Sequence, residues 1–148
     1  MKTLTENKPV KIFLDTNVII DALTMRDYDY HPSKQLLRCI VQGYFKGYIC
    51  SKQITDINYI FRKYFPSKDL IKVNLAKITK IFEILPLLKG DILSCLNKKA
   101  PDFEDAVICE VAKVNMIPYI ITNNVQHFEK CGSIVLTPQQ LLDIFSLK

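Results

Sequence analysis

The sequence has no hydrophobic run long enough to cross a membrane and contains few residues that break secondary structure. Its longest apolar stretches, such as residues 118–121, fall far short of the roughly 20 residues that a bilayer requires. Only 4 of the 148 residues are glycine and 7 are proline, whereas 49% are hydrophobic and 24% are charged. This composition excludes a membrane-spanning, fibrous or disordered chain. A chain of this length typically folds as one domain, so we expect residues 1–148 to form a single domain.

The cysteines lack the pattern of a metal site or a redox motif. Their positions are Cys39, Cys50, Cys95, Cys109 and Cys131. Their number is odd, and no two of them have the two-residue gap that is typical of zinc sites and redox dithiols. The first eight residues have no apolar core after their charges, so we expect no secretory signal and a cytoplasmic protein. We therefore expect all five thiols to be reduced and mostly buried.

The excess of positive charge is small and dispersed. The chain has 20 basic and 15 acidic residues, which gives a net charge of +5, and 17 of the basic residues are lysines scattered singly. A basic surface weakly favours polyanions such as nucleic acids as partners. If three acids were neutralised at a metal site, the rest of the surface would carry about +8. That balance suits a nuclease without identifying one.

Short β-branched runs alternate with longer helical patterns, which is typical of an α/β domain with a mostly parallel sheet. The predicted strands are residues 10–14, 48–50, 84–86, 119–122 and 134–136. The strand at 84–86 is predicted at an edge, because its proline cannot donate to a central ladder. The predicted helices are residues 17–23, 32–45, a segment from 51 to before Pro66, 67–82, 91–96, 103–114, a short turn at 125–130 and a segment from 138.

Three acids lie where a strand ends or a helix begins, namely Asp15, Asp56 and Asp105. A fourth segment, residues 121–128, ends a strand with polar groups. The carboxyl ends of parallel strands meet at one edge of a sheet, so we expect these four segments to lie together. Each acid also has an ordinary structural explanation: Asp15 can cap the next helix, and Asp102 with Asp105 resembles an N-cap arrangement. Only the convergence of the acids in space favours a catalytic role over a structural one.

A cluster of carboxylates needs a counter-charge. Two carboxylates about 4 Å apart repel by about 4 kcal/mol at an effective dielectric constant near 20, and three acids make three such pairs. The sum rivals the ~5–15 kcal/mol that stabilises a whole domain. Oxygen-rich sites of this kind suit Mg²⁺ or Mn²⁺, which lower the pKa of a bound water and neutralise charge on a phosphoryl group. Hydrolysis of a phosphodiester is the chemistry that this pattern favours.

The segments around these acids resemble the ordered motifs of the PIN domain family. The four motifs are residues 14–21, 51–56 with 59–63, 102–106, and 122–124 with 127–128, and the closing residues 136–138 are also similar to the end of the family pattern. One of them would be weak evidence, but four motifs in order along nearly the whole chain are specific. The resemblance implies one PIN-like, three-layer α/β/α domain with a central, mostly parallel five-stranded sheet. It also implies an endoribonuclease dependent on Mg²⁺ or Mn²⁺ that acts on single-stranded RNA, a homodimer, and the role of a toxin with an antitoxin partner.

The resemblance assigns roles to individual residues of this chain. The catalytic residues and main metal ligands would be Asp15, Asp56 and Asp105. Further metal ligands would be Asp102, Asn124 and His127. Residues that orient ligands or water by hydrogen bonds would be Thr16, Asn17 and Thr122. Residues that contact the RNA backbone would be Lys52 and Arg62.

Two positions depart from the family pattern in ways that affect the metal site. Asp56 stands where the family usually has glutamate, which favours contact with the ion through water. In the fourth motif Asn123 replaces an arginine and His127 replaces an acid. Loss of a carboxylate weakens binding of a hard ion such as Mg²⁺, whereas imidazole accepts Mn²⁺ or Zn²⁺. Either the metal preference has shifted, or Asn124 and Asp102 supply the missing oxygens, or activity is reduced.

Two other functions stay open at this point. One is a PIN-like module that binds RNA or protein with weak or no nuclease activity, because His127 occupies the fourth acidic position. The other is a phosphotransfer domain, either an aspartyl phosphatase or a receiver. The phosphatase pattern needs an aspartate where this chain has Asn17. A receiver needs a lysine after a late strand, where this chain continues from Thr122 with two asparagines.

Overall fold

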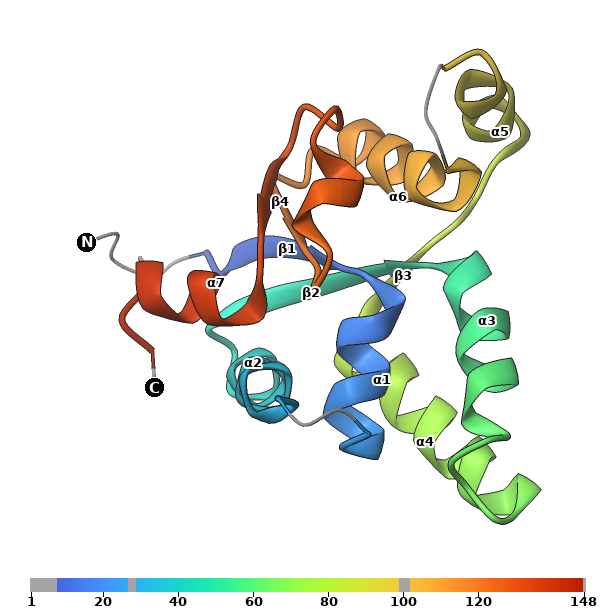
Figure 1. Cartoon of the computed structure of the whole chain (residues 1–148), viewed down its shortest axis with the longest axis vertical. Coiled ribbons are helices and arrows are strands. Elements are labelled where there is room, and N and C mark those ends of the chain that lie inside the picture. Colours follow the sequence, from blue (N-terminus) through green and yellow to red (C-terminus); the bar gives the residue numbers. More distant parts are fainter. Residues whose placement is uncertain (1–7, 27–28, 99–101, 148) are drawn as a thin grey trace.

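A computed structural model describes residues 8–26, 29–98 and 102–147. Within these residues, five parallel strands form one sheet in the order β3-β2-β1-β4-β5 (Figure 1). The strands are β1 (Val10–Leu14), β2 (Phe45–Cys50), β3 (Glu83–Leu85), β4 (Tyr119–Ile121) and β5 (Ile134–Leu136). The predicted five-stranded parallel sheet is confirmed, with β3 at an edge as expected. Residues 1–7, on which the expectation about a secretory signal depends, lie outside the described part of the chain.

Helices cover both faces of the sheet and give the three layers that were predicted (Figure 1). The helices are α1 (Thr16–Thr24), α2 (His31–Val41), α3 (Ser51–Phe61), α4 (Lys68–Ile81), α5 (Lys89–Leu96), α6 (Phe103–Val114), α7 (Pro138–Ile144) and the 3-10 helix η1 (Val125–Phe128). Helices α5 and α6 lie on one face, and α1 to α4 with α7 lie on the other. In the described residues no helix combines the length and the apolar character that crossing a bilayer would take.

The central strand β1 shows how the sequence builds a core on each face. Successive side chains of a strand point to opposite faces. Ile12 and Leu14 pack in the cluster beneath α1, α2 and α7, while Phe13 packs in the cluster beneath α6, and all three are fully or almost fully buried. A strand covered on both faces has a continuous apolar sequence, as in this segment. Burial on both sides fixes the position of Asp15, the residue that follows.

Most helix ends lie where the sequence predicts them, and two do not. α6 has the predicted bounds, and Ser67 caps α4 by accepting a hydrogen bond from the backbone N–H of Leu70. The helix predicted over 32–45 ends at Val41, because Gly43 adopts a positive φ of 88° and the chain turns into β2 at Phe45. β2 therefore begins three residues before the predicted strand. α3 ends at Phe61 rather than continuing to Pro66.

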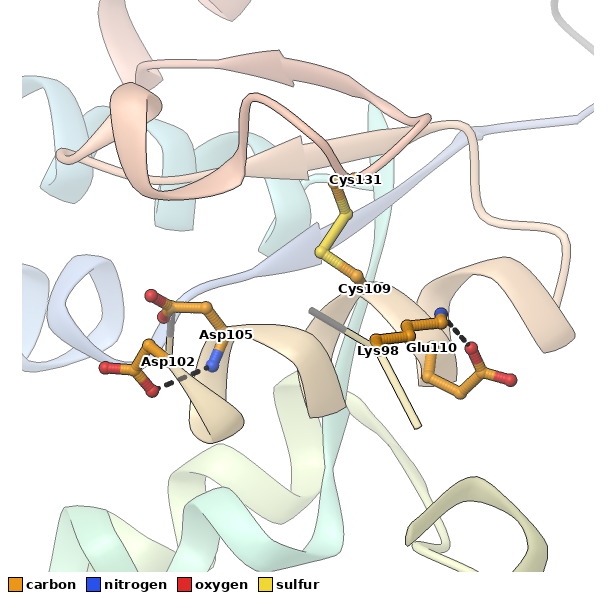
Figure 2. Close-up of a disulfide and its surroundings, with 6 residues drawn as sticks. All are labelled: Lys98, Asp102, Asp105, Cys109, Glu110 and Cys131. Carbon is orange, nitrogen blue, oxygen red and sulfur yellow. Dashed lines mark hydrogen bonds and ion pairs between the residues drawn. A yellow bond between two sulfur atoms is a disulfide. The ribbon is translucent and has the colours of Figure 1, made fainter. Parts of the chain in front are cut away.

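The expectation that all five cysteines are reduced is wrong. Cys109 of α6 and Cys131 after η1 form a disulfide, with their Cα atoms 5.4 Å apart (Figure 2). They are 22 residues apart in the sequence, so no short motif indicates that they pair. Packing of η1 and its following loop against α6 brings them together. Cys39, Cys50 and Cys95 are free and buried, as predicted.

Candidate active site

The four polar segments that were expected to converge meet at the carboxyl edge of the sheet. Asp15 directly follows β1, and its backbone N–H donates to the carbonyl oxygen of Ile121 at the end of β4, with an N–O distance of 2.9 Å. Asp56 projects from α3 and Asp105 from the first turn of α6. All three acids line one cavity of about 480 Å³, together with Asn124 and the other predicted ligands. Their convergence is therefore a feature of the fold, while their roles stay predictions.

Asp15 is held in a single orientation by a hydrogen bond from across the sheet. The residue is only 9% exposed, and Thr122 Oγ1 donates to its Oδ2 at 2.8 Å. Thr122 is itself buried, and its hydroxyl oxygen accepts from the backbone N–H of Asn124 at 3.0 Å. Burial raises the pKa of Asp15 above its usual value, and the Thr122 hydrogen bond opposes that rise. The predicted orienting role of Thr122 agrees with this contact.

Asp105 carries the most strongly perturbed carboxyl group near the cavity. Burial, together with the charges of Asp102 and Asp15, raises its pKa to about 6. Asp102 is the N-cap of α6, because its Oδ1 accepts from the backbone N–H groups of Glu104 at 2.7 Å and Asp105 at 3.4 Å (Figure 2). Asp102 thus has the structural role that the sequence suggested, and it also lines the cavity. The ionised acids at this helix start repel one another.

His127 places an imidazole beside Asp105. Its Nδ1 lies 3.8 Å from Asp105 Oδ2, and the side chain is 54% exposed. When protonated, this imidazole lowers the pKa of both Asp105 and Asp15, which opposes the effect of burial. At the position where the family resemblance calls for an acid, this chain therefore reduces the negative charge of the cavity. Asn124, which precedes η1 in the same segment, adds an amide to the cavity lining.

Lys52 connects two acids across the cavity. Its Nζ lies 3.0 Å from Asp56 Oδ2 and 3.1 Å from Glu104 Oε1, which joins α3 to α6. Burial alone would lower the pKa of Lys52, but the hydrogen bonds to these two acids raise it above its usual value. Glu104 was not among the predicted site residues, and its only signal in the sequence is its place next to Asp105. The predicted contact of Lys52 with RNA stays a prediction.

Gln53 is a buried site residue that the sequence analysis missed. Its Nε2 donates to the carbonyl oxygen of Leu14 at 2.9 Å and to Thr16 Oγ1 at 3.2 Å, and its Oε1 accepts from the backbone N–H of Cys50 at 2.6 Å. It therefore ties the end of β1 to the end of β2 beside Asp15. The sequence feature that could have indicated this role is a glutamine at the third position of a helix, where its side chain can accept from the backbone N–H of the N-cap. It was obscured because the N-cap of this helix is a cysteine, Cys50, and not a serine or threonine.

A second polar cluster, next to Asp15, joins α1 to the segment that follows β4. Asp21 of α1 is 5% exposed, and its two carboxylate oxygens accept from Arg26 Nε at 2.6 Å and Asn123 Nδ2 at 2.9 Å. Arg26 Nη2 also donates to Asn17 Oδ1 at 2.8 Å, which holds the predicted orienting residue at the cavity wall. Arg26 was not predicted to take part. Arg62, predicted to contact RNA, is exposed after the end of α3 and does not line this cavity.

The donor set fits a divalent ion held by two carboxylates and water. Within the part of the chain that the structure describes, no three side chains of histidine, cysteine, aspartate or glutamate are arranged to hold one ion. Asp15 and Asp105 both line the cavity, and both have raised pKa values. Mg²⁺ is commonly bound through one or two carboxylates and keeps several waters. Because Asp56 is paired with Lys52, the cavity is less suited to a closed cage in which Asp56 is a direct ligand.

Replacing Thr122 with valine should raise the pKa of Asp15 further and destabilise the fold. Valine keeps the shape of the side chain but removes the donor to a buried carboxylate, a loss worth about 1–2 kcal/mol. NMR titration of Asp15 and urea denaturation at pH 7 would measure the two effects. Thr122→Ser, which keeps the hydroxyl, is the matched control and should stay close to the wild type. An unchanged Asp15 titration in Thr122→Val would contradict the assigned hydrogen bond.

Comparison with known proteins agrees with this fold. A family model described as a PIN domain matches residues 11–126. Ribonuclease VapC1 of Aquifex aeolicus (strain VF5) is 27% identical over 119 residues, which cover 77% of this chain and 81% of that protein.

Solved structures share the architecture at low sequence identity and so bear on the fold alone. VapBC2 from Rickettsia felis, solved with a DNA fragment from its promoter, has a TM-score of 0.61 at 18% identity and covers 86% of this chain and 97% of that chain. PAE2754 from Pyrobaculum aerophilum has a TM-score of 0.63 at 16% identity and covers 91% and 95%. FitAcB from Neisseria gonorrhoeae has a TM-score of 0.62 at 17% identity and covers 86% and 98%. Since the family model spans most of the chain, including all three converging aspartates, this protein belongs to the PIN domain family.

Proposed function

We propose that this protein is a divalent-metal-dependent endoribonuclease that hydrolyses phosphodiester bonds in single-stranded RNA. The observation that carries the proposal is that Asp15 and Asp105 share a cavity in which the pKa of each is raised. Carboxyl groups that resist ionisation in the free protein gain from a bound cation, because the cation offsets both burial and repulsion. The similarity to Ribonuclease VapC1 supports RNA as the substrate.

Some side chains around the cavity would hold the cation, and others would position the substrate. Asp15 and Asp105 would bind Mg²⁺ or Mn²⁺ directly, with Asp56, Asp102 and Asn124 acting through water. An ion bound there lowers the pKa of a water molecule and offsets charge on the phosphoryl group. Thr122 keeps one oxygen of Asp15 fixed, which leaves the carboxylate in a constant orientation. Thr16 and Asn17 at the cavity wall would orient water molecules by hydrogen bonds.

Positive charge at the cavity would hold the RNA backbone. Lys52 lies between Asp56 and Glu104 at the cavity wall, and its pKa is raised, so it carries its charge throughout the physiological pH range. Backbone contacts of this kind position a nucleic acid without recognising its sequence. Arg62 is exposed one residue beyond α3 and would contact a more distant phosphate. His127 adds a nitrogen donor near Asp105, which favours Mn²⁺ over Mg²⁺.

We also propose an antitoxin protein as a partner and a homodimer as the assembly. The support is the family itself and its relatives named VapC1, VapBC2 and FitAcB. The chain offers apolar surface for such contacts, since Leu88, Leu93 and Leu96 are all exposed on or next to α5. Light scattering of the purified protein tests the dimer. A particle of one chain's mass over the micromolar range would contradict it.

Removing divalent ions should abolish cleavage of single-stranded RNA, and Mn²⁺ should restore it better than Mg²⁺. Independently of cleavage, Mn²⁺ at about 100 times its Kd should stabilise the folded state by about 2.7 kcal/mol. For a chain of this size that corresponds to a rise in Tm of about 5–10 °C. A fluorogenic RNA assay after EDTA treatment and a thermal unfolding series with added ions would measure both effects. The absence of cleavage and of any Tm shift with Mn²⁺, Mg²⁺ and Zn²⁺ would refute the proposal.

A PIN-like module that binds RNA or protein with little cleavage is the second candidate. Two contacts favour it: Lys52 already neutralises Asp56, and His127 occupies the position next to Asp105 where an acid was expected. Both contacts reduce the negative charge available to a metal. Wild-type protein that binds single-stranded RNA in a fluorescence anisotropy titration, but cleaves it with none of the three ions, would establish this second function.

A further inference from the structure

The disulfide joins the two segments that carry Asp105 and His127. Cys109 lies four residues, about one helical turn, after Asp105 on α6, so the two side chains share a face of the helix (Figure 2). Cys131 lies four residues after His127, and its backbone N–H donates to the carbonyl oxygen of Phe128 at 3.0 Å. The cross-link therefore fastens the loop that contains η1 to the helix that carries Asp105.

The disulfide is open to reagents from solvent, unlike the other cysteines. Both of its residues are partly exposed, and both line a cavity of about 1100 Å³. The same cavity reaches Asp105 and His127, so it adjoins the smaller cavity that contains Asp15. The three free cysteines are buried. An external thiolate can therefore approach the Cys109–Cys131 bond directly, which is the requirement for exchange.

After Asn124, few contacts besides the disulfide hold the segment between β4 and β5. The backbone hydrogen bonds around η1 are local, such as that from His127 N–H to the carbonyl oxygen of Asn124 at 3.0 Å. Phe128 is the buried apolar anchor of the segment. The His127–Asp105 separation of 3.8 Å is too long for a strong hydrogen bond. The position of His127 relative to α6 thus depends on Phe128 and the disulfide, whereas Asn124 is also held by its hydrogen bond to Thr122.

We propose that Cys109–Cys131 is a reversible redox-modification site whose co-substrate is a dithiol reductant, and that its oxidation state sets how firmly His127 is held beside Asp105. In the oxidised form the loop is fixed to α6. In the reduced form the segment around η1 gains freedom to move away from Asp105. The effect on RNA cleavage rests on the proposed function, whereas the exchange reaction and the ordering of the loop do not.

The exchange reaction proceeds in two balanced steps. A thiolate of the dithiol attacks one sulfur of the pair, which forms a mixed disulfide and releases the other cysteine as a thiolate. The second thiol of the reductant, as its thiolate, attacks the mixed disulfide and closes the reductant into a cyclic disulfide. The protein gains two electrons and two protons and ends with two thiols, and the dithiol loses the same. A disulfide oxidant reverses both steps.

Alkylation of the native protein tests whether the bond exchanges. Oxidised protein is treated with iodoacetamide, with or without prior exposure to dithiothreitol, and its mass is measured intact and as peptides. We expect two added groups, at Cys109 and Cys131, only after reduction, with the buried cysteines unmodified. Amide hydrogen exchange of residues 125–133 should then become at least about tenfold faster, while α3 is unchanged. No added groups after reduction, or unchanged exchange in the alkylated protein, would overturn the proposal.

A double variant separates the cross-link from the reductant. Cys109→Ser/Cys131→Ser should show the fast exchange of residues 125–133 without reductant and should not respond to dithiothreitol. Its affinity for Mn²⁺, measured by calorimetry, should be about tenfold weaker than that of the oxidised wild type. Cys39→Ala, which keeps the disulfide, should respond to dithiothreitol as the wild type does. If amide hydrogen exchange in the double variant equals that of the oxidised wild type, the inference is wrong.

Cleavage assays distinguish failure of this inference from failure of the proposed function. If the protein is a ribonuclease, the double variant and the reduced wild type should cleave about tenfold more slowly than the oxidised wild type. Cleavage in neither redox state would refute the proposed ribonuclease, yet alkylation and amide exchange would still decide whether the disulfide controls the loop. Equal cleavage in both states would refute the coupling to the active site.

Discussion

Replacing Asp105 with asparagine should slow RNA cleavage by about a thousandfold or more and at the same time make the metal-free protein more stable. The asparagine side chain has nearly the same shape as that of aspartate but no charge to hold a cation. The electrostatic stabilisation that a metal ion gives a phosphoryl transition state is worth several kcal/mol, and about 4 kcal/mol corresponds to a factor of a thousand. Rates measured with saturating Mn²⁺ and a fluorogenic RNA would test the loss.

The gain in stability follows from the pKa of Asp105. Burial, with the charges of Asp102 and Asp15, raises this pKa from 3.8 to about 6. A carboxyl group with a raised pKa binds its proton more tightly in the folded state, so its contribution to stability is fullest below about pH 4 and falls as the pH rises through 6. Since solvent screens this partly exposed side chain, the loss at pH 7 is about 1–2 kcal/mol. Asparagine should recover it, which raises the Tm by about 2–6 °C.

The matched control for this variant is Asp69→Asn. Asp69 lies in the first turn of α4, as Asp105 does in α6, but it is exposed and distant from the cavity. The same chemical change there should leave cleavage unaffected and cost about 0.3–1 kcal/mol through the helix dipole. A wild-type cleavage rate in Asp105→Asn would exclude this aspartate as a metal ligand. A lower Tm in metal-free Asp105→Asn would show that its carboxylate stabilises the fold.

Replacing Arg26 with alanine should lower the free energy of unfolding by about 2–4 kcal/mol. Among the residues that the structure describes, the change leaves the buried carboxylate of Asp21 with one partner, the amide of Asn123. Removal of one member of a buried ion pair typically costs about 3–5 kcal/mol, and the remaining hydrogen bond reduces that figure. The guanidinium also lies over the Tyr64 ring, 5.9 Å from its centroid, and this contact is lost as well. Urea denaturation at pH 7 would measure the difference.

Two further variants test the explanation for Arg26. Arg62→Ala removes an exposed arginine and should change stability by less than about 0.5 kcal/mol. Asp21→Asn in the Arg26→Ala background removes the unpaired charge and should recover part of the loss, which a double-mutant cycle would quantify. If Arg26→Ala were as stable as the wild type, Asp21 would not depend on its guanidinium. In that case the cluster would not stabilise the loop that contains Asn123.

The arrangement of strands and helices was predictable because it is recorded in local patterns. The apolar run from Val10 to Leu14 indicates a strand buried on both faces, and the structure places it at the centre of the sheet. Asp102 is an N-cap, as its position before a helical pattern indicated, and the helix predicted from Ser67 begins directly after that residue. The end of α2 was missed because Val41 to Tyr44 continue the helical apolar pattern, while Gly43 already has a positive φ. Periodicity indicates burial but does not show where the backbone turns.

The candidate site was predictable at the level of which segments meet, but not of which side chains pair. The carboxyl edge of a parallel sheet necessarily gathers Asp15 and Thr122. The partners of Lys52, Gln53 and Cys109 depend on distances across the fold, and the Gln53 bond to Leu14 spans 39 residues of sequence. A glutamine or a lysine in a helix carries no local sign of the distant group that it binds. Long-range pairs of this kind require the three-dimensional structure.

The position of β1 between β2 and β4 sets when the cavity can form during synthesis of the chain. The bond from Thr122 to Asp15 joins residues 107 positions apart, and β4, which flanks β1, precedes Thr122 directly. A polypeptide still on the ribosome cannot close the cavity before these late residues have been translated. The cavity that gathers the three aspartates therefore cannot form until synthesis of the chain has passed β4.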